Sequence, residues 1–563
     1  MSVASAGVLK ERPRRFRSVL GALPRAFRAV INLSPLGRTN VGAVALHVVA
    51  EGVRMKIALV FLGLLAMIVL ALPFSIKGDG SLTGAVQSYL SFSLSFTGFF
   101  LGVLTIFLSR SISDELVHRQ SFLLFSKPLA RWQYLVGKWT GMTIFNFVFL
   151  TFSFLCIYGM MHVIIRTKPP VEDSYTSGLT PTSKVDLERL AERKALIGDG
   201  TEPTQSADRL RLFTDVLTAR HSTMFKVPDF TAVAEEEFEQ RLREGFYDAA
   251  TEPVDRAKEI ERLKGKHEAR WRIIPVFGQR VFEFENILCD RSPGHFIQLR
   301  YRAELYDYPP DEIFRSMWVV GDTGKGATQY VMLPRHIVGR FHTIKVPADC
   351  VAPDGTLTVL FSNVNPYADP TWFETPEPVF YNTLEITRDG VKCLFTVGSF
   401  EGNLLRLFVL MLCKLMFLAA VGVLMTSVFS YPVACLAAFV LYALAGLRSF
   451  MNESLEQFDK YDEPVTATMS AFFNAISSGD GAKASESFQT LAAELISGGL
   501  RLIFKVVPDF SYFDGVETLV NGENVSLVWV LQGVGELVVL QTACILGLSI
   551  LLFYRREVSE TSF

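Results

Sequence analysis

Long apolar segments recur along this chain, and each is close to the roughly 20 residues that an α-helix needs to cross a bilayer. Some precede a long polar stretch and the others follow it. The pattern therefore predicts an α-helical integral membrane protein with about six transmembrane helices on the two sides of a large insert. The predicted spans are Ile57–Ile76, Ser88–Ser109, Trp139–Ile165, Leu404–Phe429, Val433–Leu447 and Val525–Phe553.

The insert between the third and fourth spans has two parts that differ in their pattern of polar and apolar residues. Its first part, 166–270, is polar and charged, with helix-like runs at Val185–Ile197, Ala234–Arg243 and Val254–Arg270. Its second part, 271–401, alternates polar and apolar residues with turn signals between the runs, which is typical of short antiparallel strands. We therefore predict an α+β insert containing a β-sandwich. The alternating runs are Val281–Glu285, Ile297–Leu305 and Leu357–Phe361.

Composition supports a membrane protein with a substantial soluble part. Half of the residues are hydrophobic and 20% are charged, whereas about a quarter are charged in an average soluble protein. The net charge is −2, and the cations cluster by membrane side without forming one basic face, so we expect no nucleic-acid partner. The seven cysteines form no CxxC pair and the eight histidines no HExxH motif. We expect no metal site.

The distribution of cations predicts the orientation. The first 56 residues are rich in Lys and Arg, and short loops with such an excess stay on the cytosolic side. Both termini are then cytoplasmic and the insert is extracytoplasmic. The predicted organisation is a basic arm and interfacial helix (1–56), spans 1–3 with a cytosolic elbow at 110–138 (57–165), a helical part (166–270), a β-sandwich (271–401), spans 4–5 (402–450), an extracytoplasmic segment (451–524), and span 6 with a cytoplasmic tail (525–563).

The elbow, Arg110–Lys138, is the stretch with the clearest candidate chemistry. It carries five cations against two carboxylates, and Pro128 is expected to end one short helix because its ring blocks the preceding turn. Leu129–Lys138 can then begin another. Phe122–Phe125 would be available to contact a partner, although an ordinary amphipathic loop has the same pattern.

The amino-acid sequence of this elbow resembles the coupling-helix region of ABC-2 type permeases, the membrane subunits of ATP-driven exporters. The chain has Gln120-Ser121 where family members usually have Gly-Thr. The closing stretch is also similar to the family's carboxy-terminal signature, although Asp509 stands where Asn is common. The matching residues are Glu115, Leu123, Leu124, Ser126, Pro128, Arg131, Gly137 and Lys138 in the elbow, and Pro508, Phe513, Leu519, Gly522, Arg555, Arg556 and Glu557 near the end.

The resemblance covers roughly the first 165 residues and those from 403 onward, and it implies a permease subunit in a bacterial cytoplasmic (inner) membrane. A separate ABC ATP-binding subunit would hydrolyse ATP, since the chain has no GxxxxGK[ST] loop. The chain would act as a homodimer or with a related permease half. The ATPase-coupling residues would be Glu115, Arg119, Phe122, Leu123, Leu124, Phe125, Ser126, Lys127, Pro128, Arg131, Gly137 and Lys138.

Three polar residues fall inside predicted spans: Lys414, Glu536 and Gln541. An ionisable group in a membrane is costly and therefore a candidate functional residue. Lys414 could instead extend toward the outer headgroups. For Glu536 and Gln541, hydrogen bonding between helices is the alternative to a role in transport or gating.

A different class of function is a membrane-anchored sensor or scaffold whose outer β-sandwich binds an envelope polysaccharide or protein. The run Phe341–Asn363 loosely resembles carbohydrate-binding jelly-roll modules. A membrane enzyme is disfavoured because no GxSxG or comparable catalytic arrangement occurs. Aromatic residues that could form a ligand platform, or simply pack, are Tyr367, Trp372, Phe373 and Tyr381; candidate cation ligands or turn residues are Asn363, Asn365 and Asp369.

Overall fold

The computed structural model divides the chain into two compact units. The membrane unit comprises Met1–Ser174, Glu401–Asn521 and Val525–Phe563, and the insert unit comprises Tyr175–Phe400 with Gly522–Asn524. The structure describes residues 39–54, 56–75, 81–117, 129–167, 212–244, 256–292, 295–305, 313–339, 341–364, 383–387, 390–458, 469, 473, 504 and 507–555.

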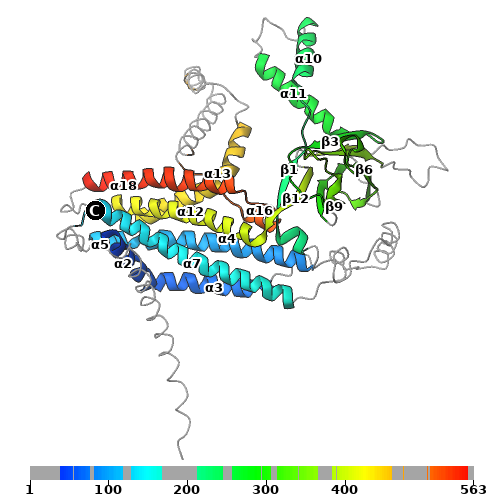
Figure 1. The fold of residues 1–563 in the computed structure, drawn as a ribbon. Coiled ribbons are helices and arrows are strands. Elements are labelled where there is room, and N and C mark those ends of the chain that lie inside the picture. Colours follow the sequence, from blue (N-terminus) through cyan, green and yellow to red (C-terminus); the bar gives the residue numbers. More distant parts are fainter. Residues whose placement is uncertain are drawn as a thin grey trace, which may run out of the picture. The chain divides into compact units, whose positions relative to one another are not determined.

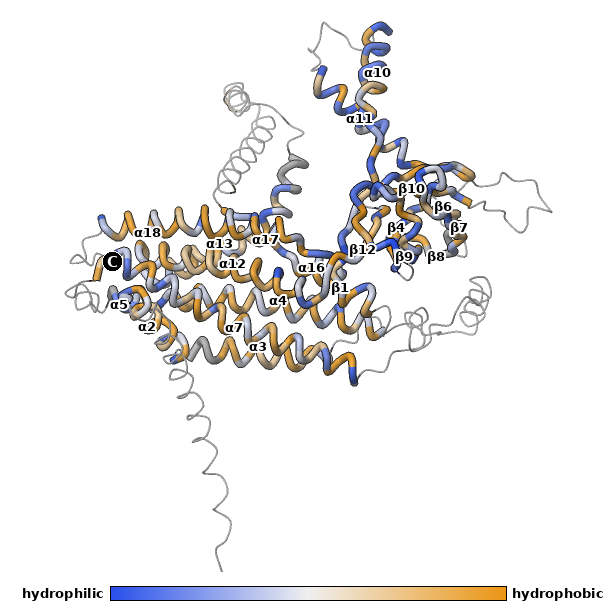
Figure 2. The backbone as a smooth tube through the Cα atoms, in the orientation of Figure 1, coloured by the Kyte–Doolittle hydropathy of each residue, from blue (hydrophilic) through white to orange (hydrophobic). Residues whose placement is uncertain are grey.

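The membrane unit is built from helices (Figure 1). Five are long and apolar enough to cross a membrane: Leu82–Glu115, Arg131–Thr167, Phe400–Val428, Tyr431–Asn452 and Leu527–Arg555. A shorter apolar helix covers Val60–Ser75, within the first predicted span. Figure 2 shows that hydrophobic residues dominate these helices. The prediction of a largely helical chain with several helices that could span a membrane is therefore confirmed.

The helices of this unit have the following bounds. They are α2 (Asn40–Arg54), α3 (Lys56–Ser75), α4 (Leu82–Leu108), α5 (Arg110–Val117), α7 (Arg131–Thr167), α12 (Phe400–Val428), α13 (Tyr431–Phe458), α16 (Val516–Val520), α17 (Leu527–Gly533), the π-helix η6 (Val534–Thr542) and α18 (Ala543–Arg555).

Two glycines allow α2 to pack closely on α7. A Cβ atom added at Gly137 would lie 2.7 Å from Cβ of Val44, and one at Gly141 would lie 2.7 Å from the carbonyl oxygen of Ala45. Small residues four positions apart let two helix backbones approach each other. The segment predicted to be an interfacial helix is thus held against the start of α7, with Val48 fully buried between them.

This packing predicts that Gly141→Ala destabilises the membrane unit, because the new methyl group would collide with the α2 backbone. Gly159→Ala is a matched control on the same helix, since its Cβ would meet no atom within 4 Å and alanine favours a helix by about 1 kcal/mol over glycine. Thermal unfolding in detergent, followed by tryptophan fluorescence, should show a lower midpoint for Gly141→Ala only. Equal midpoints would contradict the close approach.

The insert unit contains two helices and a β-rich body. The helices α10 (Thr231–Arg243) and α11 (Arg256–Arg272) overlap two of the predicted helical runs; the third, Val185–Ile197, lies outside the described residues. The remaining elements are η2 (Leu212–Val216), β1 (Thr218–Met224), β2 (Ile273–Ile274), β3 (Gln279–Phe284), β4 (Phe296–Arg302), β5 (Glu304–Leu305), β6 (Ile313–Val320), η3 (Thr323–Lys325), β7 (Tyr330–Met332), β8 (Arg335–Ile337), β9 (Phe341–Pro347), η4 (Ala348–Cys350), β10 (Leu357–Asn363), β11 (Leu384–Glu385) and β12 (Val391–Ser399).

The strands form two main antiparallel sheets that share one core. One sheet has the order β1-β12-β4-β9, and the other has the order β3-β10-β6-β7 with β8 also paired to β6. Tyr301 of β4 and Trp318 of β6 pack with ring centroids 4.6 Å apart, which joins the inner faces of the two sheets. Phe282 and Phe361 extend this core. The arrangement is that of a sandwich, and the predicted alternating runs overlap β3, β4, β5 and β10.

Residues Gly522–Asn524 complete the edge of the first sheet. The backbone N–H of Arg220 donates to the Gly522 carbonyl over 2.9 Å, and the N–H of Asn524 donates to the Arg220 carbonyl over 2.7 Å. Gly522 has φ +66, and a Cβ there would lie 2.2 Å from the Asp215 carbonyl oxygen. This position therefore requires glycine, which gives a packing reason for one residue of the carboxy-terminal signature.

Burial in the sandwich raises the pKa of the Cys350 thiol from its ordinary 9.0 to about 12. Because the unfolded thiol ionises near its ordinary pKa, the folded state should lose stability as pH rises above about 9. At pH 8, iodoacetamide should modify half-buried Cys289 before Cys350, and denaturant should expose Cys350. Rapid native-state modification of Cys350, measured by mass spectrometry, would contradict this packing.

Candidate functional site

The main polar cluster of the membrane unit lies where α2, α5 and α7 meet. Lys138 of α7 places its Nζ 2.7 Å from Oε1 of Glu115 on α5, and these residues are 1% and 6% exposed. An ion pair removed from water to this extent stabilises only if its remaining polar positions are also bonded. The surrounding side chains meet that condition.

Both side chains of the ion pair make further hydrogen bonds. Tyr134 donates its hydroxyl to the second oxygen of Glu115 over 2.6 Å. Lys138 donates to Oγ of Ser111 over 2.6 Å, and Ser111 donates to Glu51 of α2. The network thus joins all three helices, and both ends of the elbow enter it.

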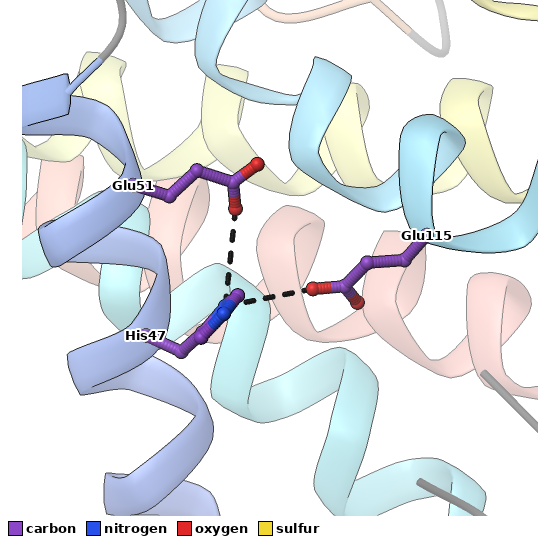
Figure 3. A group of neighbouring side chains, drawn as sticks. All are labelled: His47, Glu51 and Glu115. Carbon is purple, nitrogen blue, oxygen red and sulfur yellow. Dashed lines mark ion pairs between the residues drawn. The ribbon is translucent and has the colours of Figure 1, made fainter. Parts of the chain in front are cut away.

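The exposed side chain of His47 faces both Glu51 and Glu115 (Figure 3). Its Nδ1 is 3.5 Å from Glu115 and 3.8 Å from Glu51. The three ligand atoms lie within 4.8 Å of one another, a spacing that a metal ion could use. The Lys138 ammonium already contacts the same oxygen of Glu115 that faces His47, so the arrangement favours an ion-pair network over a metal site.

Arg131, at the first position of α7, anchors the elbow to the last helix. Its Nη1 donates to the carbonyls of Phe553 and Tyr554 over 3.3 and 3.1 Å, and its guanidinium lies 5.7 Å from the Tyr554 ring centroid. These carbonyls belong to the end of α18, where a cation also complements the helix dipole.

The candidate coupling residues therefore divide into two groups. Glu115 and Lys138 form the buried pair, Arg131 binds α18, and Gly137 packs on α2. The others lie outside the described residues: Arg119, Phe122, Leu123, Leu124, Phe125, Ser126, Lys127 and Pro128.

The predicted short helix at Leu129–Lys138 is instead part of a longer one. α7 begins at Arg131 and continues without a break to Thr167, through the predicted third span. No proline occurs between Arg131 and Thr167, and Gly137 and Gly141 are tolerated because α2 packs against them. Lys138 thus belongs to the same rigid element as the membrane span.

Lys414 has a partner within the membrane unit. Its Nζ lies 3.7 Å from Oδ1 of Asp514, with the two side chains 18% and 53% exposed. Asp514 precedes α16 in a segment that packs on α13, where the N–H of Phe510 donates to the Ala445 carbonyl over 3.0 Å. The predicted alternative, extension of Lys414 toward the headgroups, is therefore not needed to neutralise it.

Other predicted sites are only partly described. Asn363 is fully buried and donates to the Ile274 carbonyl over 3.1 Å, which is a structural use. Tyr367, Trp372, Phe373, Tyr381, Asn365 and Asp369 lie outside the described residues. Glu536 and Gln541 are adjacent in η6, with Nε2 of Gln541 3.5 Å from Glu536.

Several residues of the network were not predicted to have a role. His47 and Glu51 are four positions apart, so the sequence indicates that they share one face of a helix. Their position beside Glu115 could not be predicted, because it depends on the packing of α2 on α7. Ser111 and Tyr134 are common residue types near membrane ends and carried no signal of their own. Asp514 was not connected with Lys414 because they are distant in the chain.

Comparison with known proteins adds no identification: the chain matches no protein-family model, no curated protein and no solved structure.

Removing Lys138 should strongly destabilise the membrane unit. Lys138→Met leaves Glu115 buried without its cation, a change that typically costs about 3–5 kcal/mol. The double variant Glu115→Gln, Lys138→Met should recover part of that loss. Arg110→Met is the control, since Arg110 and Asp114 are 46% and 44% exposed and such pairs contribute up to about 1 kcal/mol. Unfolding midpoints in detergent measure all three; a Lys138→Met midpoint equal to that of the control would refute the assignment.

The Lys414–Asp514 pair can be tested by exchanging its charges. Lys414→Asp places two acids together and should lower the unfolding midpoint, and Asp514→Lys should do the same with two cations. The exchanged double variant should recover much of the loss because the attraction returns. If the losses of the single variants simply add, the two residues do not interact.

Proposed function

We propose that this chain is the permease subunit of an ABC-2 type transporter, an exporter component that forms the membrane path and couples to a separate ATP-binding subunit. The observation that carries the proposal is the buried Glu115–Lys138 pair. These residues are among those that match the family's coupling region. Glu115 lies near the start of the elbow and Lys138 at its end.

The geometry suits the transfer of movement. Lys138 belongs to a continuous helix of 37 residues, and Glu115 lies at the end of the apolar helix Leu82–Glu115. A force applied to the elbow would reach both helices through the buried pair. Arg131 would transmit it to α18 as well.

In this mechanism the elbow docks in a groove of the ATPase, with Phe122–Phe125 as apolar anchors. Closure of the ATPase pair on ATP would tilt α4 and α7 and open the path alternately to each side. The permease would act as a homodimer or with a related half, in a bacterial cytoplasmic membrane with both termini inside. ATP would bind and be hydrolysed only in the partner subunit.

A second candidate function rests on the free face of the five-stranded sheet. In register across four strands lie Val281, Leu360, Val319 and Val331, and Val281 and Val331 are 48% and 62% exposed. An apolar row on an open sheet face is suited to contact with another molecule. This favours the alternative of a membrane-anchored sensor or scaffold that binds an envelope protein or glycan.

Affinity purification in mild detergent discriminates between these functions. We expect a stoichiometric ATP-binding subunit with the wild-type chain and its loss with Phe122→Ala, Phe125→Ala, because apolar anchors at the centre of an interface carry most of its binding energy. Phe99→Ala is the matched control, a phenylalanine 53% exposed on α4.

Retention of the ATPase by the double elbow variant would contradict docking through the elbow. Absence of any ATPase, with an envelope protein retained and lost on Val281→Asp, Val331→Asp, would support the scaffold function in its place.

A further inference from the structure

The last predicted span is interrupted by a π-helix that brings two polar side chains together. The π-helix η6 covers Val534–Thr542 within the helical stretch Leu527–Arg555. Residues five apart lie about 140° from each other on an α-helix of 3.6 residues per turn. In η6 they are neighbours: Nε2 of Gln541 lies 3.5 Å from Glu536, and the Thr542 hydroxyl donates to the Leu537 carbonyl over 2.7 Å.

This local distortion is informative because π-helical turns are rare and are frequent at functional sites. Glu536 is the tenth of the 29 residues in the stretch, which places it about 13 Å along the helix from Leu527 at roughly 1.5 Å per residue. It is therefore well inside the apolar region, where a carboxylate is costly unless something neutralises it.

The two side chains present acceptors without matching donors. Among the described residues, no cationic side chain lies within ion-pair distance of Glu536, and its hydrogen-bond partner is Gln541. Among the described residues, Oε1 of the Gln541 amide is buried without a hydrogen-bond partner. Glu536 is only half-buried, so its carboxylate is the group of this pair that a donor from outside the described chain can reach.

The surroundings define the rest of the ligand. A Cβ at Gly535, the neighbour of Glu536 in the chain, would meet no atom within 4 Å from other described parts of the structure. Leu531, Val539 and Leu540 are each more than 60% exposed on the same span. A ligand that fits must combine N–H donors and a positive charge with an apolar body.

We propose that Glu536 and Gln541 form a binding site for the protonated amino group of a lipophilic amine. The ammonium donates hydrogen bonds to the Glu536 carboxylate, which the Gln541 amide holds in place, and its apolar body lies along the exposed leucines and valine. The site does not depend on ATPase coupling, so its failure and the failure of the proposed transport function are separate results.

The test uses the full chain in lipid nanodiscs and a lipophilic carbodiimide, which modifies protonated carboxyl groups inside membranes. Modification of Glu536 is measured by mass spectrometry with and without 2-phenylethylammonium. We expect the amine to slow modification about tenfold at a concentration some ten times its Kd. Its N,N,N-trimethyl analogue, which has the charge but no N–H donor, should protect far less.

Three variants complete the test. Glu536→Gln should abolish modification at this position. Gln541→Leu should keep modification but lose protection by the amine. Gln532→Leu is the matched control, because Oε1 of Gln532 already accepts a hydrogen bond from the Tyr512 hydroxyl over 3.3 Å, and it should behave as the wild type.

Several results would overturn the proposal. Equal protection by the amine and its trimethyl analogue would show that the acceptors do not select N–H donors. Modification without protection would show that no amine binds. Absence of modification in nanodiscs, with modification in dilute detergent, would show that a second copy of the chain covers Glu536.

Discussion

The buried ion pair between Glu115 and Lys138 is the interaction on which the packing of α2, α5 and α7 depends. Its charges are tolerated away from water because Tyr134 and Ser111 bond the same two groups and because Glu51 of α2 extends the network. Close packing of α2 on Gly137 and Gly141 brings Glu51 within reach. The polar network therefore depends on the two glycines, because they let α2 come close enough to α7 for Glu51 to join it.

The same principle explains how the chain handles polar groups within its apolar helices. Lys414 is paired with Asp514, which is supplied by the segment before α16. Glu536 has an uncharged partner, Gln541, which a change in helical register brings beside it. The first arrangement neutralises a charge inside one chain, whereas the second leaves the Glu536 carboxylate without a cation among the described residues.

Hydrophobic patterning was sufficient to predict the helical class and the β-rich insert, because long apolar segments and period-two alternation each require one kind of backbone. It did not predict that α7 runs without a break from Arg131 to Thr167, since Leu129–Lys138 was expected to be a separate short helix before a span that begins at Trp139. It also missed the partnership of Lys414 with Asp514 and of Glu115 with Lys138, which arise from tertiary packing between distant segments.

The proposed function requires the elbow, Arg110–Lys138, to contact an ATP-binding subunit. The most direct measurement is photocrosslinking in native membranes, with benzoylphenylalanine incorporated at Leu124. We expect an adduct between this chain and an ATP-binding protein, and no such adduct from the same group placed at Phe99, a position exposed on the apolar helix α4. Adducts with lipid alone at Leu124, in membranes that contain the assembled complex, would contradict it.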